Sequence, residues 1–418
     1  MKVFKFGGAS VKDASSIRNV ASIIRKYAAE RLVIVVSAMG KTTNAIEQIA
    51  QLAYNGNDYR PALETLKQYH DGICEELELT GITDKLFQQL SAHLINFKDL
   101  PFDQYYDQTV IFGELLSTTI VSHYLQQQAI PVSWVNAGSM IATDKNWREA
   151  NVDMEATQVA VRSTLLPLLE EQHVITQGFI GKYSPAFYTT LGREGSDYTG
   201  ALLAHCLKAE GLWIWKDVPG VLTADPKEYQ PVTLIEELSY YEAIEMTYYG
   251  ATVIHPKTIQ PLRAGNIPLY VRSFEEPEKE GSVIRMDSIK ENYPPILVLK
   301  KQQVLLSVST RDFSFMGEEH MSHIYRIFAE NRVKINLMQT AAISLSVVVD
   351  ENTARLQGLL EALSERFHVL TNSRLQLLTV RHYTDAIINE LTGDRDVLLT
   401  QKSRQTIQMV LKKDQDYL

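Results

Sequence analysis

The feature that most restricts the fold is an alternation of short apolar runs with segments of helical periodicity along the first two thirds of the chain. The run LVIVV at 32–36 is apolar and mostly β-branched, as a strand covered on both faces must be. A shorter run that ends at Gly7-Gly8 precedes it. Further strand candidates, separated by helical patterns near 153–170, 197–209 and 252–264, lie at 132–136, 173–177, 212–215 and 268–271. This order predicts a three-layer α/β domain with a mainly parallel sheet.

The remaining segments predict a second, smaller domain. Residues 61–129 carry helical patterns with almost no strand signal, which indicates a helical insertion at about 58–105. Periodicity breaks down at 275–295, where charges and Pro294-Pro295 occur, so we place a domain boundary there. Beyond it the patterns follow the order β-α-β-β-α-β, which is the ferredoxin-like arrangement of a small α+β regulatory fold.

Charge and cysteine content exclude several classes of function. The 418 residues carry 41 Lys plus Arg against 50 Asp plus Glu, and a net charge of −9 disfavours nucleic acid and anionic membranes as partners. The sequence contains no run of eighteen apolar residues and no apolar segment before Gly7 that is long enough for a signal peptide. Cys74 and Cys206 lie too far apart for a metal motif or a disulfide framework. We therefore expect a cytoplasmic protein in a reducing compartment.

Two segments near the N-terminus are candidates for phosphate binding. In KFGGAS at 5–10, glycine amides and the Lys5 ammonium lie where a strand turns into a helix, which suits a phosphate group. A tight turn that needs glycine for its backbone alone is the other interpretation. The second segment, Gly40-Lys41-Thr42, resembles the end of a P-loop, but the first glycine of that motif falls at Val35, inside a strand. It still follows a parallel strand, where open α/β sheets bind ligands.

Three further features carry polar chemistry. The segment TLGREGSDYTG at 190–200 is rich in glycine, hydroxyls and charges, although it also suits a loop with Ser196 or Asp197 as the helix N-cap. The segment WKDVPGVLTADPK at 215–227 also fits a strand followed by turns. Glu114 lies within an apolar helical run, so its carboxylate either pairs with another group or faces outward.

Taken together, these segments resemble the aspartate kinase family of the amino-acid kinase fold. Six family motifs occur in order: KFGG-[TA]-S-V at 5–11, S-A-x-x-x-x-T-N at 37–44, G-E at 113–114, L-G-R-x-G-S-D-Y-T at 191–199, D-V-P-G…D-P at 217–226 and F-G-A-x-V-x-H-P at 249–256, where Tyr249 replaces Phe. The resemblance implies a kinase catalytic domain at 1–290. It is weaker beyond that point, where it implies an ACT-like domain at 298–383 and a truncated second ACT-like module at 384–418.

The chemistry of forming an acyl phosphate by itself fits the residues of the first motif, independently of the family resemblance. The nucleophile is a substrate carboxylate, which is already ionised at pH 7, so none of the ten His need act as a base. The reaction requires neutralisation and in-line positioning of the γ-phosphoryl group. Mg²⁺, Lys5 and the amides of Gly7 and Gly8 would supply these.

The resemblance implies ATP-dependent phosphorylation of the β-carboxylate of L-aspartate, the first step toward lysine, threonine and methionine, by a homodimer joined through the ACT-like region. It places catalytic roles on Lys5, Arg193 and Asp197. The aspartate contacts that it implies are Ser37, Thr43, Glu114, Arg193, Gly195, Ser196 and Asp197. The ATP contacts are Lys5, Gly7, Gly8, Ala9, Ser10, Lys216, Asp217, Leu222, Lys227, Thr252 and Val253, with Mg²⁺ held through the ATP phosphates.

The sequence departs from common family patterns at three positions. Glu194 stands where Gly is frequent, Thr252 where many members have Lys, and Leu222 where relatives often have Tyr. The rival functions are a kinase of the same fold for acetylglutamate, glutamate or a nucleoside monophosphate, and an inactive amino-acid sensor. Glu114 together with Arg193 and Asp197 favours a free amino acid, because an acylated amine would not need a carboxylate. The presence of Lys5 and Asp197 argues against a sensor. We expect no fused homoserine dehydrogenase, because no G-x-G-x-x-G loop follows the C-terminal region.

Regulation by end products is expected to be weak. Relatives hold an effector's amino group with a T-S-E-like element, and the corresponding segment QTAAI at 339–343 has alanines in place of Ser and Glu. Losing one charge-assisted contact weakens an effector by roughly ten- to a hundredfold. Lysine and threonine are therefore predicted to inhibit weakly or not at all. The alternative is that main-chain groups of residues 310–340 hold the effector.

Overall fold

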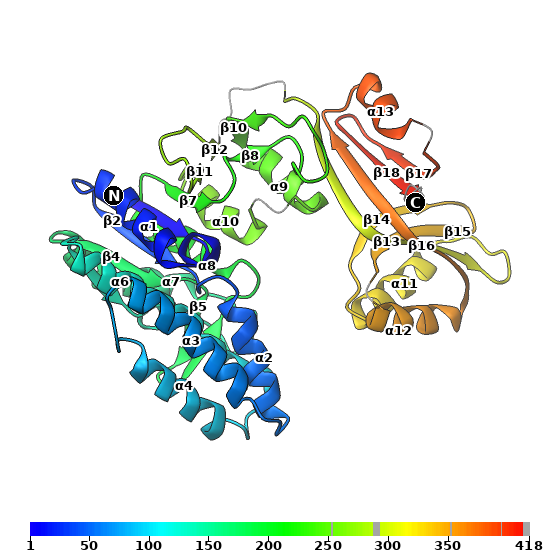
Figure 1. The fold of residues 1–418 in the computed structure, drawn as a ribbon. Helices are drawn as coiled ribbons and strands as arrows, with labels where there is room; N and C mark the ends of the chain where they lie inside the picture. Colours follow the sequence, from blue (N-terminus) through cyan, green and yellow to red (C-terminus); the bar gives the residue numbers. More distant parts are fainter. Residues whose placement is uncertain (252–253, 287–292, 352, 394, 413–418) are drawn as a thin grey trace, which may run out of the picture. The chain divides into compact units, whose positions relative to one another are not determined.

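The computed structural model describes residues 1–251, 254–286, 293–351, 353–393 and 395–412. Figure 1 shows a chain that divides into two compact units. The first comprises Met1–Val221, Leu234–Ile244 and Val253–Ile289, and the second comprises Leu222–Thr233, Glu245–Thr252 and Lys290–Leu418. Two short segments inside the predicted catalytic domain thus group with the C-terminal unit. The boundaries predicted for the three domains stay predictions.

The first unit is built on an eight-stranded sheet with the strand order β10-β12-β11-β7-β1-β2-β4-β3. These strands are β10 (Glu237–Ser239), β12 (Ser282–Arg285), β11 (Leu269–Ser273), β7 (Leu212–Lys216), β1 (Lys2–Phe6), β2 (Leu32–Val36), β4 (His173–Gln177) and β3 (Val132–Val135). Neighbouring strands are parallel, apart from the antiparallel pair β11 and β12. The predicted mainly parallel sheet is confirmed.

Strand β1 shows how the sheet separates its two faces. Phe4 and Phe6 are buried with the apolar sides of α1 (Ala14–Lys26) and α6 (Phe112–Gln127). Lys5 alternates to the opposite face, where α8 (Gly195–Leu207) packs beside α7 (Met154–Leu169) and α10 (Pro256–Ala264). Burying a side chain the size of Phe stabilises the fold by about 1.5–3 kcal/mol. The alternation therefore anchors β1 on one face and delivers Lys5 to the other.

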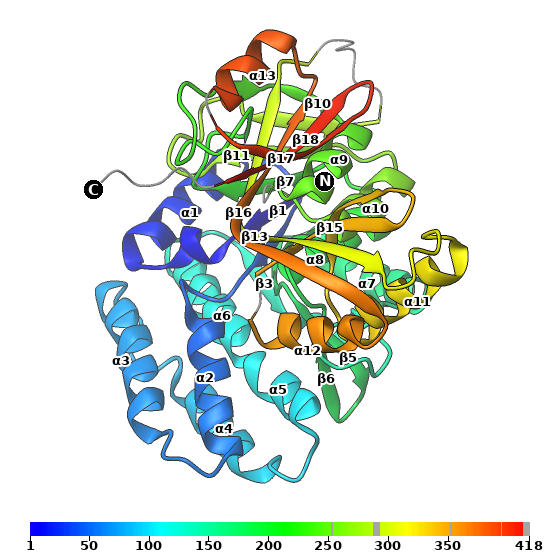
Figure 2. The same ribbon diagram turned by 90° about the vertical axis from the view of Figure 1, so that its right-hand side faces the viewer.

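A group of helices follows β2. Figure 2 shows α2 (Thr42–Tyr54), α3 (Arg60–Glu76), α4 (Asp84–Asn96) and α5 (Phe102–Val110) side by side. They share an apolar cluster that includes Ile49, Phe87 and Tyr105. The expected helical segment thus forms. A hairpin of β5 (Ile180–Ser184) and β6 (Phe187–Thr190) was not predicted, nor were η1 (Gly8–Val11), η2 (Ala137–Ser139), β8 (Val221–Leu222), β9 (Leu234–Ile235) and α9 (Tyr240–Tyr249).

The second unit carries an antiparallel six-stranded sheet with the order β14-β15-β13-β16-β18-β17. Its elements are β13 (Ile296–Thr310), α11 (Glu318–Glu330), β14 (Ile335–Thr340), β15 (Ser344–Asp350), α12 (Thr353–Ser364), β16 (Phe367–Arg381), α13 (Asp385–Thr392), β17 (Val397–Lys402) and β18 (Thr406–Lys412). The order β-α-β-β-α-β from β13 to β16 matches the ferredoxin-like pattern. The last strands extend the same sheet, because β18 pairs with β16.

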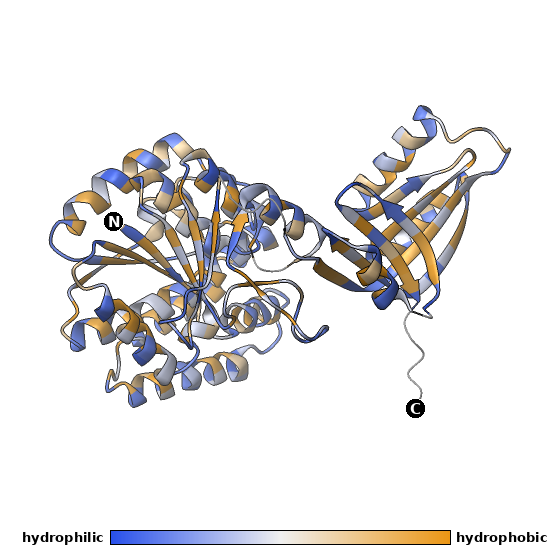
Figure 3. Ribbon diagram, turned by 90° about the horizontal axis from the view of Figure 1, so that it is seen from above, coloured by the Kyte–Doolittle hydropathy of each residue, from blue (hydrophilic) through white to orange (hydrophobic). Residues whose placement is uncertain are grey.

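Hydrophobic residues concentrate on the strands and on the inner sides of the helices, as Figure 3 shows. In the second unit α11 and α12 cover one face of the sheet, where Leu306, Ile324 and Leu359 belong to one buried cluster. None of the helices in the described part of the chain is long and apolar enough to cross a membrane.

Candidate active site

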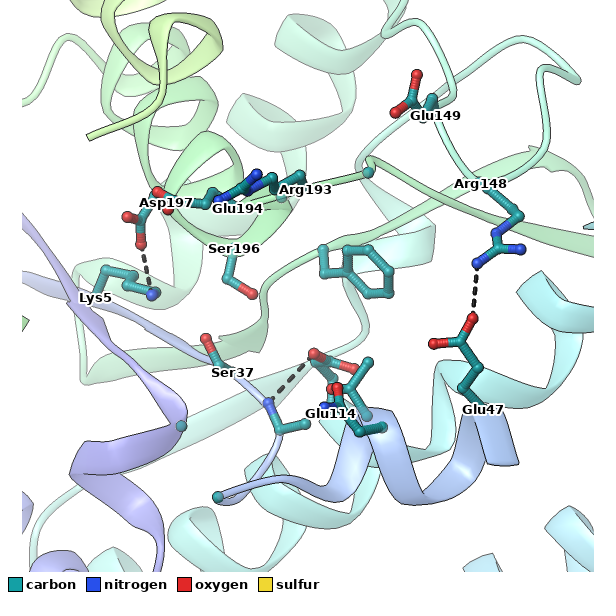
Figure 4. Close-up of a pocket in the computed structure, with 18 of the residues that line it drawn as sticks. Lys5, Ser37, Glu47, Glu114, Arg148, Glu149, Arg193, Glu194, Ser196 and Asp197 are labelled. Atoms are coloured by element: carbon teal, nitrogen blue, oxygen red, sulfur yellow. Dashed lines mark hydrogen bonds and ion pairs between the residues drawn. The ribbon is translucent and has the colours of Figure 1, made fainter. Parts of the chain in front are cut away.

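A cavity of about 700 Å³ opens at the carboxyl ends of the parallel strands in the first unit. Lys5 reaches it from the end of β1, Ser37 directly follows β2, and Lys216 ends β7. Figure 4 shows Lys5 and Asp197 on one side of this cavity and Arg148 with Glu47 on the other. The predicted site residues that line it are Lys5, Gly8, Ser37, Thr43, Glu114, Arg193, Gly195, Ser196, Asp197 and Lys216.

One end of the cavity holds a buried ion pair. The Lys5 ammonium nitrogen lies 2.5 Å from Oδ1 of Asp197, and the ammonium nitrogen of Lys216 lies 3.8 Å from Oδ2. Burial opposes ionisation of Asp197, but the two ammonium groups hold the pKa of this carboxyl below its ordinary value. Asp197 therefore stays ionised in the first turn of α8, where negative charge also suits the helix dipole. The arrangement fixes two cations at one end of the cavity, and a pair of this kind can neutralise an anionic group such as a phosphoryl group.

Gly8 allows the two glycine-containing loops to meet. A Cβ atom at this position would lie 2.7 Å from the carbonyl oxygen of Ala38 and 3.0 Å from that of Gly40. The Gly40 N–H also donates to the Gly8 carbonyl at 3.0 Å. A larger residue would push the loops apart, so Gly8 brings the segment after β1 against the segment after β2.

Glu114 is the second buried carboxyl of the cavity. Only 3% of the residue is exposed, and it faces the cavity instead of the solvent, so the outward-facing alternative is wrong. Oε1 accepts a hydrogen bond from the Ala38 N–H at 3.2 Å, while Oε2 has no hydrogen-bond partner among the described residues. Burial raises the pKa of Glu114 to about 8, although the Ala38 N–H works against this rise. A cationic ligand would supply the missing partner.

The segment before α8 brings further charges to the cavity. Arg193 is exposed and lines the cavity wall, and Glu194 follows it with a φ of +53°, in the left-handed region that favours glycine. Oε2 of Glu194 is buried and has no hydrogen-bond partner within the described ranges. The backbone thus explains why glycine suits position 194. In this chain the position adds a carboxylate to the site at the cost of backbone strain.

Five lining residues lie outside the segments that the sequence singled out, namely Glu47, Tyr106, Arg148, Glu149 and Phe179. Ala38, Gly40, Asn44, Gly192 and Glu194 lie within those segments but were not named as ligand contacts. The Arg148 guanidinium pairs with Glu47 at 2.8 Å and lies over the Tyr106 ring, with its carbon 4.0 Å from the ring centroid. Arg148 belongs to a loop without helical or strand periodicity, so the sequence pattern offered no signal for it.

Some predicted ATP contacts do not line this cavity. Gly7 is half-buried, Ala9 is exposed, and Ser10 is buried with its hydroxyl donating to the Trp215 carbonyl at 3.3 Å. Asp217 is exposed directly after β7. Leu222 and Lys227 belong to the second unit. Thr252 and Val253 lie outside the described residues.

Comparisons with known proteins agree with one another. A sequence model of the amino acid kinase family matches residues 1–273. The chain is 30% identical over 392 residues to lysine-sensitive aspartokinase 3 of Escherichia coli, which covers 90% of this chain and 86% of that protein. It is 33% identical over 307 residues to the aspartokinase of Chlamydia trachomatis, covering 72% and 69% of the two chains. The crystal structure of E. coli aspartokinase III in complex with aspartate and ADP superposes with a TM-score of 0.84 at 27% identity, covering 99% of this chain and 96% of that one.

Proposed function

The chain belongs to the aspartokinases of the amino acid kinase family, and we propose that its cavity holds L-aspartate between Glu114, Arg193 and Lys5. As an aspartokinase it uses ATP to phosphorylate the β-carboxylate of aspartate, the first step toward lysine, threonine and methionine. The residue roles below are our proposal for how this chain performs that reaction.

One observation supports this placement of aspartate. Oε2 of Glu114 has no hydrogen-bond partner among the described residues, and Glu114 lines the same cavity as Arg193. The ammonium group of aspartate would donate to Glu114 and favour its ionised form. The planar fork of Arg193 would bind the α-carboxylate through two parallel hydrogen bonds. Ser37, Thr43, Gly195 and Ser196 line the same space and complete the polar surface around the substrate.

Transfer then needs little chemistry from the protein. An oxygen of the substrate's β-carboxylate forms a bond to the γ-phosphorus while the bond to the bridging oxygen of ADP breaks. Lys5 neutralises charge on the phosphoryl group in transit, and Asp197 keeps the Lys5 ammonium at the cavity end through the 2.5 Å ion pair. Lys216 and the Gly8 main chain lie beside them. Gly7, Ala9, Ser10, Asp217, Leu222 and Lys227 remain proposed nucleotide contacts on the resemblance alone.

The residues present fit a magnesium ion carried by ATP. Within the described ranges no group of three His, Cys, Asp or Glu side chains is arranged to hold a metal ion, and both oxygens of Asp197 face ammonium groups. Mg²⁺ commonly keeps several waters and binds through substrate phosphates with one or two carboxylates. We propose that the ATP phosphates hold Mg²⁺, which would neutralise phosphate charge there.

An ADP-release assay across acceptors tests this placement. L-aspartate is expected to be the best acceptor, with L-glutamate, acetylglutamate and UMP far behind. N-acetyl-L-aspartate keeps both carboxylates but lacks the ammonium group, so it should be used poorly if Glu114 binds that group. Efficient turnover of N-acetyl-L-aspartate would contradict the role of Glu114. An absence of ADP release with every acceptor would favour the sensor alternative.

We also propose that the enzyme is a homodimer joined through its C-terminal unit. Phe313 and Phe315 are 79% and 78% exposed in the loop after β13, and aromatic side chains this exposed are typical of interaction surfaces. Light scattering should give twice the chain mass for the native protein and less for Phe313→Asp with Phe315→Asp. A monomeric native protein would reject the dimer.

For location we propose the cytoplasm, because Cys74 and Cys206 are buried free thiols that a reducing compartment preserves. Cell fractionation tests this location directly.

A further inference from the structure

Asp107 joins two chain segments that are far apart in the sequence. It lies on α5, is fully buried at 0% exposure and accepts four hydrogen bonds. The main-chain N–H of Arg148 donates to both carboxylate oxygens, at 3.0 and 3.2 Å. The N–H and the hydroxyl of Thr190 donate at 3.1 and 2.8 Å. One carboxylate therefore fixes the loop at 143–151 against the end of β6.

Both segments carry a guanidinium group that lines the cavity. Arg148 lies in the loop, and Arg193 comes shortly after Thr190 at the end of β6. The segments also contact each other directly, since the Ala150 N–H donates to the Thr190 carbonyl at 2.9 Å. Gly192 has a φ of +79°, and a Cβ atom there would lie 3.1 Å from Cγ of Glu149, so the loop packs against the residue that precedes Arg193. The two segments form one packed body with Asp107 at its centre.

The loop also stores backbone strain at Arg148. Its φ is +68°, a conformation that costs a non-glycine residue roughly 1–2 kcal/mol. The hydrogen bonds to Asp107 offset this cost. Beyond the backbone, the guanidinium is held by Glu47 at 2.8 Å and lies over the ring of Tyr106. Strain that the surroundings maintain next to a ligand cavity is a common sign of a pre-organised site.

We propose that Asp107 is a positioning residue for aspartate binding, which holds Arg148 and Arg193 at the cavity wall so that both guanidinium groups face the substrate's carboxylates. The inference rests on the proposed function, in which Arg193 binds the α-carboxylate. Asp107 itself is buried on α5 and does not line the cavity. Its loss should therefore weaken aspartate binding without touching the phosphoryl end at Lys5.

Protonation of Asp107 should make the KM for aspartate depend on pH, which gives a second test of its positioning role. Burial raises the pKa of Asp107 to about 7, although the donors of Arg148 and Thr190 oppose the rise. Arg148 and Tyr106 are the charged and titratable groups that interact with Asp107, and the Arg148 guanidinium in turn faces Glu47 and Asp103. A protonated carboxyl turns one acceptor oxygen into a donor that faces N–H groups, so the two segments loosen. The KM for aspartate is therefore expected to rise as the pH falls below about 7.

The test is Asp107→Asn in the full-length enzyme. Its amide places a donor against the N–H groups, so the KM for aspartate should rise about ten- to a hundredfold with kcat and the KM for ATP close to wild type. The part of the wild-type change in KM that is centred near pH 7 should disappear in the variant, whereas the part that Glu114 contributes near pH 8 should remain. Asp103→Asn is the matched control, because exposed Asp103 lies 3.6 Å from the same guanidinium but accepts no main-chain bond from Arg148, and we expect a change below about twofold.

Thr190→Val is a second variant that tests the role of Asp107 if Asp107→Asn does not fold. It removes only the hydroxyl donor, and a several-fold rise in the KM for aspartate is expected. A wild-type KM and pH profile in the folded variants would overturn the role of Asp107, and so would equal losses in kcat and in both KM values. Arg193→Lys is measured in parallel. If it raises the KM for aspartate while the Asp107 and Thr190 variants do not, this inference alone fails; if it has no effect, the proposed function fails at Arg193.

Discussion

Lys5 and Asp197 form a buried ion pair of 2.5 Å at the cavity end, although they lie on different elements, β1 and α8. Lys5 reaches this face because Phe4 and Phe6 bury the other side of β1. Asp197 lies in the first turn of α8, which begins at Gly195 beside the cavity, so its carboxylate can reach Lys5. The pair ties β1 to α8, so the end of the cavity at which we propose that the phosphoryl group lies depends on both elements.

Replacing Lys5 by Met should mainly lower kcat, because the ammonium matters most when the phosphoryl group is in transit. Groups of this kind are typically worth about 3 kcal/mol, or roughly a hundredfold in rate. Lys2→Met on the same strand, whose ammonium pairs with Glu30 away from the cavity, is the control and should keep full activity. Steady-state kinetics with aspartate and ATP measure both variants. A kcat near wild type for Lys5→Met would reject the phosphate-end assignment.

Glu114→Gln should separate binding from stability. The folded-state pKa of Glu114 is about 8 against 4.5 in a model peptide, so the folded chain retains a proton that the unfolded chain loses. The stabilising contribution of Glu114 is therefore fully present below pH 4.5 and is lost as the pH rises through about 8. The variant should raise Tm at pH 9 by at least about 2 °C.

The same substitution should raise the KM for aspartate about ten- to a hundredfold through the loss of a charged hydrogen bond. Thermal melts at pH 6 and pH 9 and kinetics at pH 8 check the two effects together. A collapsed Tm with an unaltered KM would mean that Glu114 serves the fold instead of the substrate.

Arg193→Lys keeps the positive charge but removes the planar fork. We expect a rise of about tenfold or more in the KM for aspartate and little change in the KM for ATP. Arg25→Lys, which changes an exposed arginine that bonds to Gln128, is the control. An equal rise in both KM values would move Arg193 to the nucleotide side of the cavity.

Glu194→Gly should relieve strain and remove a charge at once. Glycine accepts a φ of +53° without cost, so we expect a gain of about 0.5–1 kcal/mol in the free energy of unfolding after the greater freedom of glycine in the unfolded chain is counted. Loss of the carboxylate should also lower the KM for ATP. Lys208→Gly is matched, because Lys208 ends the same helix with a φ of +52° and lies outside the lining set. It should gain stability with unchanged KM values, and denaturant melts with kinetics distinguish the two effects.

The sequence predicted the parts of the structure that local patterns encode. The run at 32–36 became the fully buried strand β2, and parallel strands necessarily bring Lys5, Ser37 and Lys216 to one edge of the sheet. Local patterns failed where distant contacts decide the structure. The loop residue Arg148 lines the cavity, and its main chain is held by Asp107 on α5, but neither residue has a local signal in the sequence.

In the second unit, too, local sequence patterns miss structure that depends on distant contacts. Strand β16 runs from Phe367 to Arg381, whereas the sequence pattern indicates a strand only at 375–381. Most residues between 368 and 374 are exposed and polar, so they read as a loop. They form a strand because β13 pairs with them through the register Thr371 with Leu306 and Leu370 with Ser307. Pairing of this kind depends on a partner that sequence periodicity does not reveal.

Weak inhibition by end products is the last prediction, and it depends on the loop between β14 and β15. Ala341 and Ala342 are exposed there and offer neither the hydroxyl nor the carboxylate that would bind an effector's ammonium group. The alternative is that main-chain groups bind the effector, but two main-chain groups of this loop are already hydrogen-bonded. The Met316 N–H donates to the Ala342 carbonyl and the Ala341 N–H donates to the Ser344 carbonyl, each at 2.8 Å.

An amino acid would therefore have to compete with existing hydrogen bonds at a loop where Ala341 and Ala342 supply no charged partner, which costs about 1.5–3 kcal/mol or roughly ten- to a hundredfold in affinity. Inhibition titrations with lysine, threonine and their mixture at fixed aspartate and ATP measure this. Ala342→Glu restores a carboxylate and should lower the concentration of lysine needed for half-inhibition. Submillimolar half-inhibition of the native enzyme would show that main-chain groups alone bind the effector, and the prediction would be wrong.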